Sequence, residues 1–304
     1  MYKLGSSLLP ISLAVAGLSC ASPSAPGASS PGGAGAEPSL SLVPYNPGVK
    51  AMFPVTSILV TGRDDALLVD AQFARKDALK LVDAVKASHK RLTTIYISQA
   101  DPDYYFGLDA LQDAFPAAKI VATRATVERI KATEKHKFGY WGPILKEDAP
   151  KRIVVPEPLD GSKITLEGHA IEVLGLDAAP DRTCLWIPSL KAVVGGVVVF
   201  SGVHVWMTDT EAPGARANWL ALLDRIEQLQ PRTVVPGHYL EGSKFDISAV
   251  RFTRDYIKVF DAEAAKAENS AALMAAMEKR YPELGLKTSL EFSSKVAKHE
   301  MTWD

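Results

Sequence analysis

The chain is 304 residues long, with 47% hydrophobic and 23% charged residues, so it can bury the core of one large globular domain or of two small ones. Its formal net charge is -1, its sequence pI is about 6.6, and it has no long run of like charges. This balance excludes the basic surface that binding to a nucleic-acid backbone requires. We therefore expect a small molecule, and no nucleic acid, as the partner.

Residues 1–20 are predicted to form an export signal. One lysine precedes an apolar stretch of signal-peptide length, and small residues close the segment, in MYKLGSSLLPISLAVAGLSC. The stretch is too short to span a membrane stably. Cys20 stands where a bacterial lipoprotein carries its acylated cysteine, although Leu18 stands one place too late for the usual lipoprotein signal. We expect an exported protein, either a lipoprotein that meets the membrane only through its lipid, or a periplasmic or secreted protein.

Residues 21–40 are predicted to form a flexible tether, because they consist mostly of serine, proline, glycine and alanine. Such a segment cannot offset the entropy of ordering, so we expect it to pack against nothing. Residues 41–304 then form the folded part. Its one cysteine, Cys184, lies in the strand-like run TCLWIP and is expected in the core.

The first half of the folded part alternates between strand and helix patterns. Two β-rich runs, PVTSILVTG and DALLVDAQF, flank a turn at 63–65 and predict a hairpin. Helical spacing of apolar residues predicts a helix from about Lys76, and LTTIYIS predicts a strand. After the loop QADPD, the run YYFGLDALQDAF predicts one short helix and KIVAT another strand. Because open α/β sheets hold ligands at the carboxyl ends of strands, this polar loop is where we expect chemistry.

The second half repeats the alternation. Strands are predicted at RIVV, KITLE, AIEVLGL, TCLWIP and KAVVGGVVVF. An apolar stripe over 219–229 predicts a helix that leads into TVVPGHY, and stripes over 252–260 and 273–277 predict two C-terminal helices. These stripes are expected to face the core.

Five segments resemble, in order and spacing, the motifs of the metallo-β-lactamase superfamily. They are ALLVDAQF, IYISQADPDYYFGLDAL, IEVLGLDAAPDRTCLWIP, AVVGGVVVF and TVVPGHY, and the resemblance runs from about residue 43 to about residue 245. It implies a four-layer αββα sandwich of the α/β (α+β) class. Its active site would lie at the edge where the loops of the two sheets meet.

The metal-binding positions of that family are altered here. The family motif His-x-His-x-Asp-His reads Gln99, Asp101, Asp103 and Tyr104 at its ligand positions, so only Asp103 keeps the family residue type. The resemblance implies that His238, in the intact last motif PGHY, keeps its role as metal ligand or general base.

Other family positions have lost their ligands too. The histidine of the third motif falls at Ala178, or at Asp177 with a shift of one residue, and Val197 stands where an aspartate bridges two metals. Asp70 matches a family aspartate that orders the loops around the site. One imidazole with several oxygen donors is a harder site than zinc favours. The altered positions therefore imply at most one divalent ion and make a dizinc site unexpected. They do not distinguish zinc from manganese or iron. The candidate ligands are Gln99, Asp101, Asp103, Asp177 and His238.

Several of these residues have a second interpretation. Asp101 and Asp103 in Asp-Pro-Asp also suit a turn and a helix N-cap. The Tyr104 phenol can donate to an oxyanion, or fill the volume that a metal would occupy. Aromatic and polar side chains in neighbouring loops are candidates for binding substrate, with core packing or turn formation as the alternative; these are His204, Trp206, Arg182 and Tyr105.

Two functions follow. The first is a hydrolase of a small ester, lactone or amide, in which Asp103, His238 and Tyr104 carry the chemistry at an atypical, mononuclear metal site. The second is a metal-free, non-catalytic relative that binds a small ligand or a partner at the same cleft, since a fold does not determine a function. Metal analysis of the purified protein separates the two.

Overall fold

A computed structural model describes residues 40–303. The predicted signal and nearly all of the predicted tether, residues 1–39, lie outside the described part. Leu40, which we had placed at the end of the tether, is buried in the core between the sheets, because it packs beside the first strand. Among the described residues, no helix is long and apolar enough to cross a membrane.

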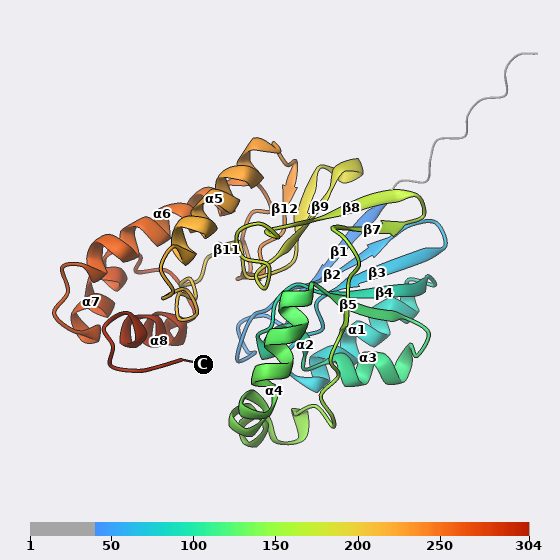
Figure 1. Cartoon of the computed structure of the whole chain (residues 1–304), viewed down its shortest axis with the longest axis horizontal. Coiled ribbons are helices and arrows are strands. Elements are labelled where there is room, and N and C mark those ends of the chain that lie inside the picture. The colour runs from blue at the N-terminus through green and yellow to red at the C-terminus, as the bar shows by residue number, and fades with distance from the viewer. Residues whose placement is uncertain (1–39, 304) are drawn as a thin grey trace, which may run out of the picture. The chain divides into compact units, whose positions relative to one another are not determined.

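The first sheet contains six strands in the spatial order of the chain (Figure 1). The first three strands are antiparallel neighbours, whereas β3 to β6 run parallel. The strands are β1 (Ser41–Tyr45), β2 (Ser57–Thr61), β3 (Asp65–Val69), β4 (Arg91–Ile97), β5 (Lys119–Ala122) and β6 (Glu157–Pro158).

The second sheet has the order β12-β10-β9-β8-β7, and a separate short pair joins β11 to β13. The parallel pairs are β10 with β12 and β11 with β13, and the other neighbours are antiparallel. The strands are β7 (Lys163–Leu166), β8 (His169–Leu174), β9 (Cys184–Ile187), β10 (Ala192–Val194), β11 (Phe200–Ser201), β12 (Thr233–Val234) and β13 (His238–Tyr239).

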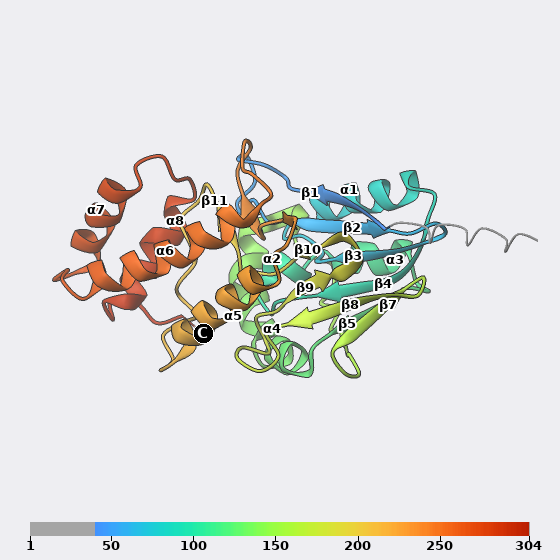
Figure 2. The same cartoon turned by 90° about the horizontal axis from the view of Figure 1, so that it is seen from above.

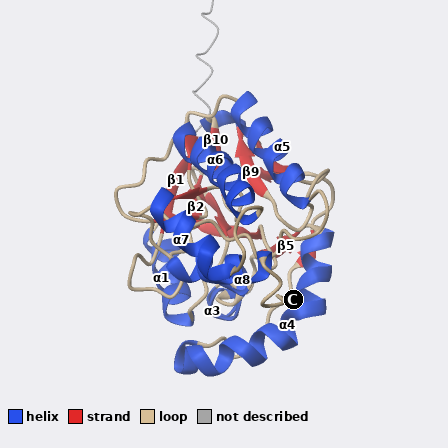
Figure 3. Cartoon of the chain, turned by 90° about the vertical axis from the view of Figure 1, so that its left-hand side faces the viewer, coloured by secondary structure: helices blue, strands red, loops and turns tan. Residues whose placement is uncertain are grey.

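The helices lie outside the two sheets (Figures 1 and 2). The first sheet has α1, α3 and α4 on its outer side, and α5 and α6 cover the second sheet. Figures 1 and 2 show α6, α7 and α8 gathered at one end of the domain, and Figure 3 views the domain from that end. The helices are α1 (Arg75–Ala87), α2 (Pro102–Tyr105), α3 (Leu108–Ala114), α4 (Arg124–Leu145), α5 (Ala215–Gln228), α6 (Ile247–Ala264), α7 (Ser270–Arg280) and α8 (Lys287–Ala297).

Strand alternation explains the layers. In β3, Leu67 and Val69 point into the apolar cluster between the sheets, whereas Ala66 and Leu68 belong to the cluster beneath the helices. Both faces of this strand are therefore buried, as expected for a sheet covered on each side. The predicted αββα sandwich is confirmed.

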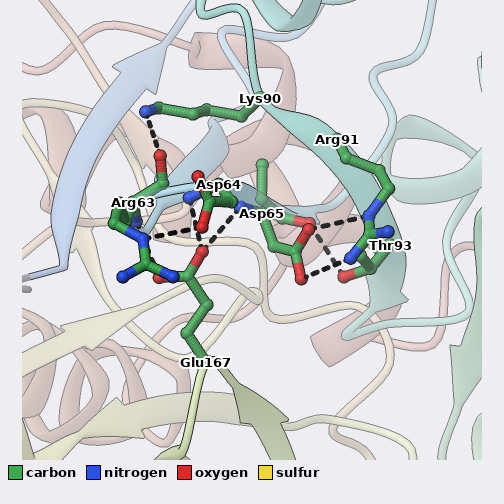
Figure 4. A network of polar contacts seen from close by, with 8 residues as sticks. Arg63, Asp64, Asp65, Lys90, Arg91, Thr93 and Glu167 are labelled. Atoms are coloured by element: carbon green, nitrogen blue, oxygen red, sulfur yellow. Dashed lines mark hydrogen bonds and ion pairs between the residues drawn. The ribbon is translucent and has the colours of Figure 1, made fainter.

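The two sheets are joined by polar contacts at the end where β3 and β4 begin (Figure 4). Glu167, in the turn between β7 and β8, accepts hydrogen bonds from the backbone amides of Arg63, Asp64 and Asp65 at 2.7, 2.5 and 2.7 Å. Arg91 at the start of β4 donates to both carboxylate oxygens of Asp65, at 2.8 and 3.1 Å. This end of the sandwich is opposite the carboxyl ends of β3 and β4.

Several element predictions were wrong in detail. The run RIVV is not a strand, because pairing with β5 begins only at Glu157. The run KAVVGGVVVF divides into β10 and β11, because Gly195 and Gly196 take φ of 83° and 73° and turn the chain. The run YYFGLDALQDAF forms two helices that separate at Phe106–Gly107, where a Cβ on Gly107 would lie 2.0 Å from the Ala71 carbonyl oxygen.

Two helices were not predicted. The 22-residue α4 follows β5 and crosses the region that we had left without structure. The C-terminal part contains three helices instead of two, because α8 follows α7.

Candidate functional site

Loops that follow the carboxyl ends of four strands meet on one side of the sandwich. Asp70 follows β3, residues 98–103 follow β4, residues 195–199 follow β10 and His238 lies beyond β12. Asp70 connects two of these loops: its carboxylate accepts from the Ser98 amide at 2.9 Å, from the Ser98 hydroxyl at 2.8 Å and from the Gly196 amide at 3.2 Å. Burial raises the pKa of Asp70 to about 7, against the lowering effect of these hydrogen bonds.

Close backbone packing brings the last loop to the others. A Cβ on Gly237 would lie 1.8 Å from the Gly196 carbonyl oxygen, so only glycine fits at position 237. The Gly237 amide also donates to the Val199 carbonyl at 2.9 Å. These contacts fix where the next residue, His238, is placed.

Asp103 and His238 form a buried pair. Asp103 Oδ2 lies 3.3 Å from His238 Nε2, and the two side chains are 12% and 6% exposed. The imidazole stacks on Phe200 with centroids 5.3 Å apart, and the Tyr104 ring meets it edge-on at 5.9 Å. Burial raises the pKa of Asp103, while the hydrogen bond and charge of His238 act to lower it. The structure thus brings together the two residues that the sequence favoured most.

Asp101 is paired with a lysine. Lys137 Nζ of α4 lies 2.9 Å from Asp101 Oδ1 and donates to the Ala100 carbonyl at 3.1 Å. The Lys137 and Asp101 side chains are 4% and 16% exposed. Burial acts to raise the pKa of Asp101, but the charge and hydrogen bond of Lys137 outweigh it and hold the pKa below its usual value. Asp101 therefore keeps its negative charge, and Lys137 balances that charge.

The two polar residues flanking this pair differ in their surroundings. The Gln99 amide oxygen accepts from the adjacent Ala100 amide at 2.7 Å, so the side chain folds back on its own backbone. The Tyr104 hydroxyl is buried and has no hydrogen-bond partner among the described residues. Burial, followed by the charges of Asp103 and Asp70, raises the pKa of Tyr104 well above its usual value, so the phenol keeps its proton and remains a donor.

An aromatic pocket opens beside the Asp103–His238 pair. It holds about 480 Å³ of empty space, its open mouth included. The lining comes from segments that are far apart in the chain, and it includes the C-terminal Trp303. The lining residues are Phe53, Phe73, Asp101, Pro102, Asp103, Tyr104, Trp141, Val197, Phe200, Trp206, His238, Leu286, Ser289 and Trp303.

Five of the predicted site residues do not line this pocket, and Gln99, described above, is one of them. Arg182 lies 2.5 Å from Asp209 Oδ1 through Nη2, and its guanidinium lies over the Trp219 ring at 4.5 Å. His204 Nδ1 lies 2.9 Å from the Tyr256 hydroxyl in the interior. The others are Tyr105, which is buried in the core, and Asp177, whose side chain is 92% exposed and lies 3.6 Å from Arg225.

A family comparison accounts for this arrangement of loops. The family model described as the metallo-beta-lactamase superfamily matches residues 52–238. The chain belongs to the metallo-β-lactamase superfamily. A search of curated proteins finds no match.

Solved structures of superfamily members share the fold at low identity. A metallo-beta-lactamase family protein from Thermus thermophilus is 16% identical with a TM-score of 0.61, over 86% of this chain and 91% of that chain. A metallo-beta-lactamase from Pontibacter korlensis is 17% identical with a TM-score of 0.51, over 72% of this chain and 95% of that chain. Similarity at this level shows the fold alone.

The donor set does not fit the metal that the superfamily implies. Among residues 40–303, no three His, Cys, Asp or Glu side chains are grouped to hold an ion. Asp103 and His238 are two such donors, but the charge of Asp101 is balanced by Lys137, and Val197, where the sequence resemblance implies a bridging aspartate, adds an apolar side chain to the pocket wall. The five-residue ligand set expected from the sequence is thus not assembled, since Asp177 is at the surface and Gln99 is bound to its own backbone.

The sequence analysis missed Lys137 and Asp209, which form buried ion pairs with two of the predicted site residues. Each pairs with a residue distant in the chain, Asp101 and Arg182 respectively. Lys137 lies in the run EKHKFGYW, which is typical of a solvated helix face. Only the burial of its position, unknown from the sequence, distinguishes it from the neighbouring lysines.

Proposed function

We propose that the protein hydrolyses an ester, lactone or amide bond of a small, largely apolar molecule, and that the Asp103–His238 pair carries the proton transfers. The observation that supports this is the 3.3 Å contact of these two groups in the wall of an aromatic pocket. A carboxylate that holds an imidazole beside a substrate site is the usual arrangement of a general base.

The proposed reaction uses only side chains of the chain. The pair accepts one proton from a water molecule, and the hydroxide oxygen bonds to the substrate carbonyl carbon. The Tyr104 hydroxyl donates a hydrogen bond to the oxygen that becomes negative. As the bond from carbon to the leaving oxygen or nitrogen breaks, the pair returns the proton to that atom. The atomic balance is substrate plus water to acid plus alcohol or amine.

A second candidate is binding without catalysis. The specific observation in its favour is the ion pair of Asp101 with Lys137, which removes a free carboxylate from the loop where the superfamily places its ligands. In that case the aromatic pocket would hold a ligand, and the Asp103–His238 pair would serve only to orient it.

The test is a panel of alkyl and aryl esters, lactones and amides, assayed with and without a chelator. We expect hydrolysis that resists the chelator, and a loss of about 10²- to 10⁴-fold in kcat/KM in His238→Gln and Asp103→Asn. The matched control is His136→Gln on the exposed side of α4, which should keep full activity. Full activity in Asp103→Asn, or complete loss with the chelator, would overturn the proposed mechanism. Ligand binding with no turnover on the whole panel would support the second candidate.

We also propose that the protein is exported and that Cys20 carries a lipid. The support is the composition of residues 1–40 alone. Cell fractionation and labelling with an alkyne fatty acid test this, with Cys20→Ala as the control. Unlabelled protein in the periplasm or medium would support export and contradict lipidation. Protein in the cytoplasm would contradict both proposals.

A further inference from the structure

The pocket lining contains two groups of aromatic side chains that contact one another. Phe53, Phe73 and Trp141 contact one another with ring centroids 5.2 to 5.5 Å apart. Trp206 and Trp303 form a second group, with centroids 5.2 Å apart and ring planes at 79°. Both groups line the same pocket, so a ligand inside can contact rings of both.

The ionisable side chains of the pocket lining are two aspartates and one histidine. None of the described lysines or arginines lines it, whereas Asp101, Asp103 and His238 do. Lys137 already balances Asp101, and Arg182 is held by Asp209 away from the lining. Among the described residues, the His238 imidazole is the one ion-pair partner of Asp103. An anionic ligand would therefore find no cationic partner among the described lining residues, and a cationic ligand would find one carboxylate without a fixed counter-ion.

Two buried polar atoms at the pocket have no partner within residues 40–303. They are the Tyr104 hydroxyl and His238 Nδ1, and both residues line the cavity. A buried polar group without a partner is costly, so each is explained by a ligand or by water that satisfies it. Tyr104 and His238 therefore each carry a polar atom next to the aromatic walls that a ligand or a water can satisfy.

We propose that the ligand of this pocket carries a compact quaternary ammonium group, which lies against the two aromatic groups with Asp103 as its counter-ion. This rests on the proposed function in that the same pocket is taken as the substrate site. Aromatic faces attract such a cation, and because it has no N–H donors it needs no hydrogen bonds from the apolar walls. The ester or amide carbonyl of the same molecule would meet the Tyr104 hydroxyl.

The test compares choline with 3,3-dimethylbutan-1-ol, a neutral carbon analogue of nearly the same shape that likewise cannot be hydrolysed. Binding is measured by calorimetry and by tryptophan fluorescence, since Trp141, Trp206 and Trp303 all line the pocket. We expect choline to bind at least about tenfold more tightly than the alcohol. Equal affinities, tighter binding of the alcohol, or no binding of choline would overturn the proposal.

Variants locate the site. Trp206→Leu, Trp303→Leu and Asp103→Asn should each reduce the affinity for choline about fivefold or more and change that for the alcohol much less. The matched control is Phe115→Leu, which also removes an aromatic ring but lies outside the pocket lining. A preference for choline that persists in the Trp206→Leu/Trp303→Leu double variant would overturn the proposed site.

The outcomes separate this inference from the proposed function. Preferential binding of choline, with no hydrolysis of choline esters or of any ester on the panel, supports the cation site and contradicts the hydrolase. Hydrolysis of neutral esters, with no preference for choline, supports the hydrolase and contradicts the cation site.

Discussion

Lys137 carries a buried ammonium group whose carboxylate partner is Asp101. Removal of one member of a buried ion pair leaves the other charge without compensation, which costs about 3 kcal/mol or more. We therefore predict that Lys137→Met lowers the free energy of unfolding by about 3 kcal/mol in denaturant titrations. Adding Asp101→Asn to that variant should restore much of the loss.

The control for this prediction is Lys135→Met, an exposed lysine on the same helix. Its effect should stay within about 0.5 kcal/mol. Wild-type stability in Lys137→Met would show that the pair does not hold the loop.

His204 is a completely buried histidine whose pKa is lowered by burial from 6.5 to about 4. The folded state keeps this imidazole neutral, whereas the unfolded chain binds a proton below about pH 6.5. The contribution of His204 to stability is therefore fully present above about pH 6.5 and is lost as pH falls towards about 4. We predict that the free energy of unfolding of His204→Gln falls less steeply over this range than that of the wild type.

Denaturant titrations at several pH values between about 7.5 and about 4 measure this difference. An exposed histidine, as in His89→Gln, provides the control, which should follow the wild-type curve. Parallel curves for the wild type and His204→Gln would contradict a neutral, buried His204.

At the scale of residues, the sequence predicted that Asp103 and His238 share a site, because both stand in recognisable motifs. It did not predict the ion pairs that depend on which side chains are buried. Asp103 and His238 each stand in a recognisable motif, and they lie together. The contact of Lys137 with Asp101 spans 36 residues, and the partner of Arg182, Asp209, follows β11 in a loop with no motif. Side-chain pairing of this kind leaves no local pattern in the sequence.

Replacing either of two glycines by alanine is predicted to change the free energy of unfolding, with opposite signs for the two positions. In Gly237→Ala the new Cβ would lie 1.8 Å from the Gly196 carbonyl oxygen, so the loops of β10 and β12 would have to move apart. We expect a loss of more than about 2 kcal/mol in the free energy of unfolding. Gly139→Ala, in α4 with no atom within 4 Å of its Cβ, should instead stabilise the protein by about 0.5 to 1 kcal/mol.

Thermal unfolding of the two variants checks whether Gly237→Ala lowers and Gly139→Ala raises the stability of the protein. A Gly237→Ala protein as stable as the wild type would contradict the close contact of the two loops.

At the scale of elements, periodicity predicted the strands and helices that have a clear apolar stripe. It did not predict α4, because Gly139, Gly142 and Pro143 break the pattern within the helix. The error at β10 has the opposite cause. A continuous apolar run suggested one strand, but the chain turns at Gly195 and Gly196 to bring Val197 to the pocket.

For the whole molecule, the donor set predicts a low metal content. The purified protein should hold far less than one equivalent of zinc, because Asp103 and His238 alone cannot complete a tetrahedral site. Elemental analysis after dialysis measures this, with the His238→Ala variant as the matched sample, which should give the same content. Stoichiometric zinc that is lost in His238→Ala would contradict the altered site.

The Glu167 contacts, at the end of the sandwich away from the pocket, have a consequence for how this protein can change. They join the two sheets through the backbone amides of residues 63–65, with no help from the loops that carry Asp103 and His238. Substitution of the Asp103 or His238 side chain therefore leaves this connection between the sheets intact. We therefore expect the far end of the sandwich to stay joined in variants that change the chemistry of the pocket.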